Sequence, residues 1–252
     1  MTNYYTQIDT LTTAMALDYQ YYQKSVKNSD LLVLAFTGWA GKLHLQAGKF
    51  LYHSGLRNAS KIVIYDKSRL KTLGGFPPRF VDFDACFQFV KEEISEIPHK
   101  YLVCVGTSGG GHSAMLYAHL LNADSAVVFS TYPYLKKETI RAMHDPAAKM
   151  MADQIELFDQ LPMQAKKYFD LDKVLATWNG TTRYSMHASA NHKWDAKRTL
   201  YMQRVPGVEI KLHPYDAHGL GGVLARSGKL RECFVQAGVP VGNYDIHPDA
   251  ME

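Results

Sequence analysis

One serine of the chain stands in a setting that suits a nucleophile. Ser108 lies in Gly106-Thr-Ser108-Gly-Gly110, after the apolar run Tyr101–Val105 and before a helical pattern over residues 112–121. A short apolar run bounded by glycine is typical of a buried parallel strand. A glycine-flanked serine between a strand and a helix is the setting of a nucleophile elbow, which exposes the serine on a sharp turn. Small residues two positions away on either side let such a turn close. We therefore predict that Ser108 is a nucleophile.

Other glycine-rich motifs fit this loop less well. A dinucleotide-binding loop needs an acidic residue at the end of the next strand, and the next apolar run, Ala126–Ser130, ends in serine. A phosphate-binding loop of the Walker type needs a lysine after the glycines, and none follows them. A glycine-rich turn with a purely structural role stays open as an alternative.

A nucleophilic serine needs an imidazole base, and the imidazole needs a carboxylate that orients it. In a parallel sheet the functional loops follow the carboxyl ends of the strands. His218 follows the last predicted strand, Val208–Leu212, and Asp195 follows the strand before it, Thr182–Met186, where a helix begins. We predict His218 as the base and Asp195 as the acid. A plain helix N-cap is the alternative for Asp195, and Asp216 is a rival acid whose position is more typical of a turn.

The other histidines have simpler explanations. His112 and His119 are expected to pack on the helix after Ser108, and His44 is expected at the surface. His187 and His192 are expected to be polar loop residues, with a contact to substrate as the alternative. The sequence contains no His-Glu-x-x-His motif and no cysteine pair. We therefore predict no metal site, and the proposed chemistry needs no cofactor.

Apolar runs alternate with helical patterns along the chain. Strands are expected at residues 31–36, 61–65, 101–105, 126–130, 182–186 and 208–212, and helices near 43–53, 83–97 and 222–237. This alternation predicts one α/β domain over residues 1–252, with a mostly parallel sheet covered by helices on both faces. Residues 15–22 form a weak candidate for an antiparallel edge strand. Residues 131–180 interrupt the alternation with a helical insertion, including a long helix over 147–161, which either covers the sheet or acts as a lid.

The elbow, followed by the acid after the penultimate strand and the base after the last strand, resembles the α/β-hydrolase superfamily. The resemblance covers residues 31–237, and it implies the α/β-hydrolase fold and an oxyanion hole. One donor would be the N–H of Gly109, and the second would be the N–H of Trp39 in the loop Thr37-Gly-Trp39. Many members carry His-Gly-X in this loop, so Thr37 departs from the common pattern.

These residues predict a serine hydrolase that cleaves a carboxylic ester, or a thioester or amide, through an acyl-enzyme on Ser108. The substrate would be a small-molecule or glycan-linked ester. An acyltransferase with the same acyl-enzyme and a non-catalytic binding protein are the alternatives. Four aromatic residues lie at predicted strand exits or in nearby loops, where they either line a substrate pocket or simply pack: Trp39, Tyr132, Tyr134 and Trp194.

The composition fits an ordinary globular domain. Of the 252 residues, 46% are hydrophobic and 21% are charged, and the net charge of +4 shows no basic stripe, so nucleic-acid binding is not expected. The three cysteines are unpatterned and predict buried free thiols. No signal peptide and no membrane span is apparent, so we expect a cytoplasmic protein. The sequence is compatible with a homo-oligomer.

Overall fold

The computed structural model describes residues 22–66, 68–76, 80–146, 149, 152–178 and 180–242. Its strands form one seven-stranded sheet in the order β1-β3-β2-β4-β5-β6-β7. The strands are β1 (Tyr22–Ser25), β2 (Leu31–Phe36), β3 (Ser60–Ile64), β4 (Tyr101–Thr107), β5 (Ser125–Phe129), β6 (Arg183–Ser189) and β7 (Val208–His213). Only β1 runs antiparallel to its neighbour; the other pairs are parallel. The predicted α/β fold class is confirmed.

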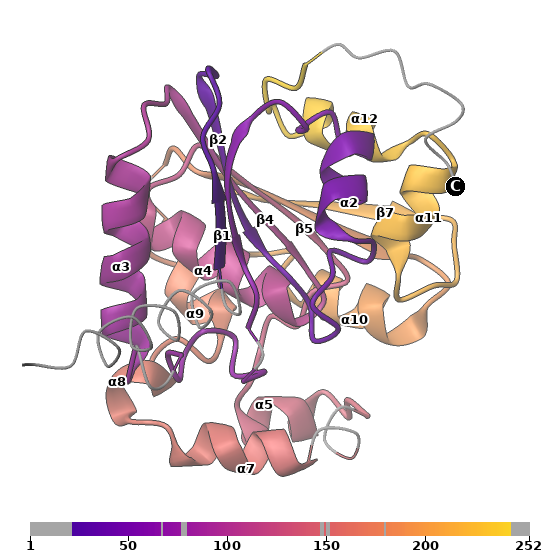
Figure 1. The fold of residues 1–252 in the computed structure, drawn as a ribbon. Coiled ribbons are helices and arrows are strands. Elements are labelled where there is room, and N and C mark those ends of the chain that lie inside the picture. Colours follow the sequence, from indigo (N-terminus) through magenta and orange to yellow (C-terminus); the bar gives the residue numbers. More distant parts are fainter. Residues whose placement is uncertain are drawn as a thin grey trace, which may run out of the picture.

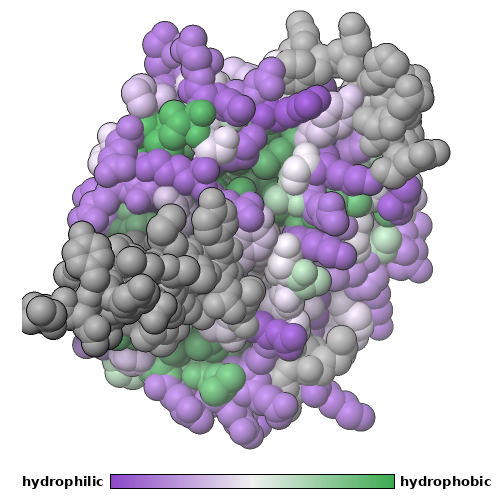
Figure 2. Space-filling view, viewed as in Figure 1, coloured by the Kyte–Doolittle hydropathy of each residue, from purple (hydrophilic) through white to green (hydrophobic). Residues whose placement is uncertain are grey.

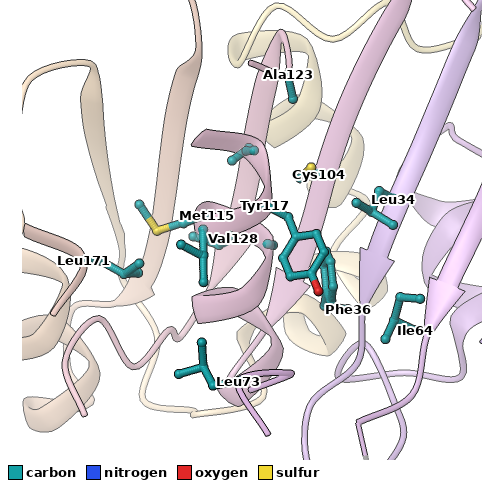
Figure 3. Packing of buried hydrophobic residues seen from close by; sticks show 14 of the residues in the cluster. Leu34, Phe36, Ile64, Leu73, Cys104, Met115, Tyr117, Ala123, Val128 and Leu171 are labelled. Carbon is teal, nitrogen blue, oxygen red and sulfur yellow. The ribbon is translucent and has the colours of Figure 1, made fainter. Parts of the chain in front are cut away.

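Helices cover both faces of the sheet (Figure 1). One face packs on α3 (Phe83–Ser95), α4 (Gly109–Leu121) and α9 (Leu171–Leu175), and the other on α2 (Ala47–His53), α11 (Leu220–Arg226) and α12 (Leu230–Gln236). Figure 3 shows the core cluster on the face covered by α3, α4 and α9. Strand β2 is buried along its whole length because alternate residues enter opposite clusters: Leu34 and Phe36 join one, and Val33 and Ala35 the other.

The register of the sheet aligns the carboxyl ends of its central strands. Phe36 at the end of β2 pairs with Gly106 of β4, and Thr107 pairs with Phe129 at the end of β5. Phe129 in turn pairs with His187 of β6. The loops that follow these strands therefore leave the sheet at one edge, which is where parallel sheets gather functional residues.

The insertion contains several short helices. They are α5 (Lys137–Ala142), α7 (Ala152–Gln160), α8 (Met163–Lys166) and the already named α9. Helices α5 and α7 lie together at one end of the sheet (Figure 1). The later part of the helix predicted over 147–161 corresponds to α7. Residues 147, 148, 150 and 151 lie outside the described residues. Residues 15–21 of the predicted edge strand also lie outside the described residues. Tyr22, the last residue of that prediction, begins the antiparallel edge strand β1.

The single helix predicted over residues 222–237 is wrong. The structure has two helices, α11 and α12, separated by a turn at Gly228. Gly228 has φ +71°, a left-handed conformation that ends a helix and that glycine adopts without a steric penalty. The amphipathic pattern continues across the break because both helices pack on the same core cluster.

One face of the molecule can be judged from its surface colouring. The face shown in Figure 2 is largely hydrophilic, with apolar side chains in small separate groups. Among the described residues, no helix has the length and apolar character needed to cross a bilayer.

Candidate active site

Ser108 occupies a strained turn between β4 and α4. Its φ of 52° and ψ of −122° lie in a region that non-glycine residues rarely adopt. The turn is closed by the Ser108 N–H, which donates to the carbonyl of Phe129 at 2.8 Å. Glycine is required around it, because a Cβ on Gly106 would collide with the backbone of Gly110, and a Cβ on Gly110 would collide with the carbonyl of Phe36. The strain follows from close packing of backbone on both sides.

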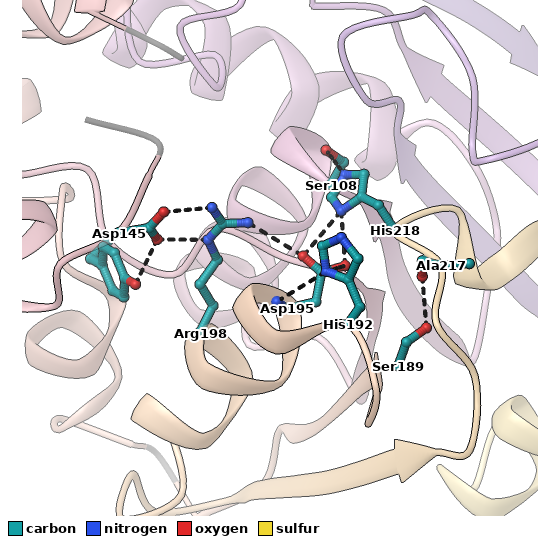
Figure 4. A network of polar contacts seen from close by, with 9 residues as sticks. Ser108, Asp145, Ser189, His192, Asp195, Arg198, Ala217 and His218 are labelled. Carbon is teal, nitrogen blue, oxygen red and sulfur yellow. Dashed lines mark hydrogen bonds and ion pairs between the residues drawn. The ribbon is translucent and has the colours of Figure 1, made fainter. Parts of the chain in front are cut away.

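Ser108, His218 and Asp195 form a continuous hydrogen-bonded chain (Figure 4). His218 Nε2 lies 2.9 Å from Ser108 Oγ, and His218 Nδ1 lies 2.9 Å from Asp195 Oδ2 and 3.1 Å from Oδ1. They come from the β4–α4 turn, the first turn of α10 (Lys193–Tyr201) and the loop after β7. The structure thus brings together three side chains that are 23 and 110 residues apart in sequence.

The burial of the three groups suits a serine whose proton is taken by a histidine that a buried carboxylate orients. Asp195 is fully buried, whereas the His218 side chain is 37% exposed and Ser108 is partly exposed. An ionised carboxylate only accepts hydrogen bonds, so His218 Nδ1 must donate to Asp195 and the lone pair of Nε2 then faces the serine hydroxyl. In this tautomer the imidazole can accept the hydroxyl proton as the serine attacks.

Asp195 belongs to a larger buried network that the sequence did not predict. Arg198, one turn later on α10, reaches Asp195 Oδ1 with Nη1 at 3.3 Å. The same guanidinium binds both carboxylate oxygens of Asp145 at 2.6 and 2.7 Å. Burial lowers the pKa of Arg198, but the hydrogen bonds to Asp145 outweigh it and hold that pKa above its ordinary value. Arg198 therefore links Asp145, which belongs to the helical insertion, to Asp195.

His192 is a closer neighbour of the acid than the sequence indicated. It precedes α10 as the N-cap residue, and its Nδ1 accepts the N–H of Asp195 at 3.4 Å. Its ring lies 5.9 Å from that of His218. The N-cap interpretation of Asp195 is wrong, because the helix begins at Lys193 and Asp195 lies inside its first turn.

The loop expected to complete an oxyanion hole packs directly on Ser108. A Cβ on Gly38 would lie 3.4 Å from the Ser108 Cβ. The Trp39 indole covers Gly109, with Nε1 2.8 Å from where a Cβ of Gly109 would lie. That indole nitrogen is shielded from solvent and has no hydrogen-bond partner among the described residues. The two residues expected to donate, Gly109 and Trp39, are thus neighbours beside Ser108.

The four predicted pocket aromatics fall in different places. The rings of Trp39 and Tyr132 stack at 6.3 Å, and Tyr132 lies 6.1 Å from His218. Tyr134 is only 2% exposed and its hydroxyl donates to Asp145, so it packs behind the site and does not line it. Trp194 lies under the ammonium groups of two lysines of its own helix, and no contact joins it to the triad within the described residues.

His44, expected at the surface, lies against the base. Its ring meets that of His218 edge-on at 5.7 Å, and its Nδ1 accepts the N–H of Gly221 at 3.1 Å. Burial, followed by the nearby His218, lowers the pKa of His44 to about 3. A neutral His44 therefore supports one side of the His218 ring.

Lys71 is a buried lysine that the sequence analysis did not single out. Its side chain is shielded from water, and Nζ lies over the rings of Trp39 and Phe158 at 4.8 and 5.0 Å. Nζ donates to the carbonyl of Arg69 at 3.2 Å. Burial lowers the pKa of Lys71 to about 7, although Asp66 acts in the opposite direction. Lys71 thus places a titratable amine between the Trp39 loop and α7.

A cavity of about 380 Å³ lies elsewhere, between residues 73, 74 and 81–84 on one side and residues 161, 162, 164 and 165 on the other. No triad residue lines it. Volume alone does not define a reactive site, whereas a nucleophile, a base and an acid in hydrogen-bonded order do. We therefore take the Ser108 chain as the candidate active site.

Comparison with known proteins identifies the fold. No family model and no curated protein matches the chain. The chain is similar to an S-formylglutathione hydrolase from Agrobacterium tumefaciens (TM-score 0.54, 10% identity, 88% of this chain and 90% of that chain). It is also similar to the capsule O-acetyltransferase of Neisseria meningitidis serogroup A (0.57, 12%, 86% and 90%) and to carboxyl esterase 2 from the mycorrhizal fungus Tuber melanosporum (0.50, 13%, 84% and 82%). The chain has the α/β-hydrolase fold, as the sequence resemblance implied.

The Arg198 network generates a stability prediction. Arg198→Gln should lower the free energy of unfolding by about 3 kcal/mol, because it removes the guanidinium that neutralises the buried carboxylate of Asp145. Urea unfolding of the variant would measure the loss, with the exposed Arg204→Gln as a matched control. Combining Arg198→Gln with Asp145→Asn should cost less than the sum of the single changes; additive losses would contradict a direct interaction.

Lys71 generates a pH-dependent prediction. Its pKa is about 7 in the folded protein and near 10.5 when the chain unfolds, so the unfolded chain binds more protons between these values. Stability of the wild type should therefore rise with pH across this interval. Lys71→Met should stabilise the protein by about 1 kcal/mol or more at pH 7, and the gain should shrink toward pH 10. Thermal unfolding across pH would test this; a loss at every pH would show that the ring contacts outweigh the cost of burial.

Proposed function

We propose that the protein is a serine hydrolase that cleaves a carboxylic ester through an acyl-enzyme on Ser108. The observation that carries this proposal is the chain of 2.9 Å contacts from Ser108 through His218 to the buried Asp195. A serine at the N-terminus of α4 with a base within hydrogen-bond reach is the arrangement that nucleophilic acyl transfer requires.

In this mechanism Ser108 Oγ attacks the acyl carbon while His218 Nε2 takes the hydroxyl proton. The carbonyl oxygen becomes an oxyanion, which the N–H groups of Gly109 and Trp39 would stabilise together with the N-terminal end of α4. His218 then protonates the leaving alcohol and the acyl-enzyme remains. Water, deprotonated by His218, releases the acid and restores Ser108. Asp195 holds the imidazole in place and stabilises its charged form in both steps.

The comparisons support ester chemistry in general. Two of the similar structures are named as a hydrolase and an esterase. Trp39 and Tyr132, which border His218 and the elbow, would form part of the wall that holds the acyl or alcohol group. We propose small-molecule or glycan-linked esters as the substrate class.

Labelling with a fluorophosphonate tests the activated serine. Wild-type protein should gain one adduct by intact mass, and Ser108→Ala should gain none, because the nucleophile is gone. His218→Ala should react far more slowly, and Asp195→Asn should be slower by roughly 10⁴-fold because the imidazole loses its orienting partner. The exposed Ser95→Ala serves as the matched control. Adduct formation in Ser108→Ala to the same extent as in the wild type would refute the proposal. Absence of an adduct in both proteins would favour a binding protein.

Acyl transfer to an acceptor other than water is the second candidate. It is favoured by the similarity to a capsule O-acetyltransferase, which covers 86% of this chain. The first half-reaction is the same, because the acyl-enzyme forms on Ser108 in either case; only the nucleophile that resolves it differs.

The partition of the acyl group separates the two functions. With an activated acetyl ester and increasing concentrations of a sugar alcohol, a hydrolase should release free acetate throughout, because water reaches His218 without competition. A transferase should convert a growing share of the acetyl group into acetylated acceptor, measurable by mass spectrometry. Ser108→Ala should abolish both products, and product formation that persists in this variant would contradict an acyl-enzyme on Ser108.

A further inference from the structure

Three metal-ligating side chains meet where β6, β7 and α12 pack together. His187 Nδ1 and His213 Nε2 are 3.0 Å apart. One ring nitrogen of each histidine and Cys233 Sγ all lie within 4.8 Å of one another. Donor atoms around a tetrahedral zinc ion, with bonds of about 2.0–2.3 Å, lie roughly 3.3–3.8 Å apart. Small rotations of the side chains would therefore place all three donors on one cation.

The environment of His187 orients it for this role. Its Nε2 lies 3.0 Å from the Ser185 hydroxyl, which points to the same face of β6 because the two residues are two positions apart. Its ring is stacked on Phe129 at 4.9 Å with an angle of 19°. When Nε2–H donates to Ser185, the lone pair of Nδ1 faces His213. Metal-bound histidines are commonly fixed by such a hydrogen bond from the distal ring nitrogen.

The charges around the cluster define what it would bind. Burial raises the pKa of the Cys233 thiol to about 12, and the thiol contacts only the Lys229 carbonyl, at 3.7 Å, among the described hydrogen bonds. A cation would displace the thiol proton to solvent, and the proton of His213 Nε2 would move to Nδ1. Lys211 and Lys229 add positive charge near the two imidazoles, so the thiolate is needed to offset it.

From this geometry we propose that His187, His213 and Cys233 bind one divalent ion of the zinc class, at a site that shares no residue with the Ser108 chain. Two imidazoles and a thiolate are the ligands that such borderline ions prefer. His213 is partly exposed, which leaves an entry path and a fourth position for water. The bound ion would link the edge strand β7 to β6 and α12, and so stabilise the strand that leads into the His218 loop.

Cobalt and zinc titrations of untagged protein, freed of metal with a chelator, test the site. The wild type should bind one equivalent of Zn²⁺ by calorimetry and unfold at a higher temperature with Zn²⁺ than without it. Co²⁺ should give a thiolate charge-transfer absorption. Cys233→Ser should remove this absorption, and His213→Gln should weaken binding at least tenfold. Cys86→Ser, which alters another buried thiol on α3, is the matched control and should bind as the wild type does.

Three results would overturn the proposal: no bound equivalent in the wild type, a cobalt spectrum without the thiolate absorption, or unchanged binding in both Cys233→Ser and His213→Gln. His213→Gln alters a partly exposed residue and is expected to fold, so it remains informative if the buried Cys233 does not tolerate serine. Fluorophosphonate labelling of Ser108 does not depend on this cluster, so each proposal can fail alone.

Discussion

The left-handed backbone of Ser108 is the constraint on which the site depends. It exists because β4 and α4 approach each other so closely that only glycine fits at 106 and 110, and because the Phe36 carbonyl at the end of β2 leaves no room for a side chain at Gly110. The Phe129 carbonyl of β5 holds the turn by accepting the Ser108 N–H. The buried strands around the turn offset the free-energy cost of this conformation, because the packing of their side chains stabilises the fold. The exposed hydroxyl is thus a consequence of how the sheet and helix pack.

A second dependence is electrostatic. Asp195 is fully buried and would be costly as a lone charge, but His218 and Arg198 both contact its carboxylate. Arg198 extends this set to Asp145 and also lies 4.0 Å over the ring of Tyr132, which borders the base. The insertion therefore does more than cover the sheet: it contributes a buried carboxylate to the network that holds the acid.

Most of the fold could be predicted because its signals are local. Runs such as Leu31–Phe36 are apolar throughout only when both faces of a strand are covered. The structure places the ends of every predicted strand from residue 31 onward within three residues of the prediction. The two errors have different causes, one local and one from a contact far along the chain. The amphipathic period of the final helix continues across Gly228, and the pattern does not report the left-handed turn there. His44 appeared polar and exposed, yet it packs on a ring that lies 174 residues later.

The strands along the chain, the glycine-flanked turn and the positions of Ser108, Asp195 and His218 at strand exits could all be predicted from the sequence, because they depend on neighbouring residues and on the rules of parallel sheets. Which side chains come into contact follows from the folded structure alone. Three sets of contacts join residues far apart in sequence: Arg198 with Asp145, the Lys71 amine between two rings, and the cluster at His187. No local pattern encodes such contacts, because they depend on how the completed layers pack.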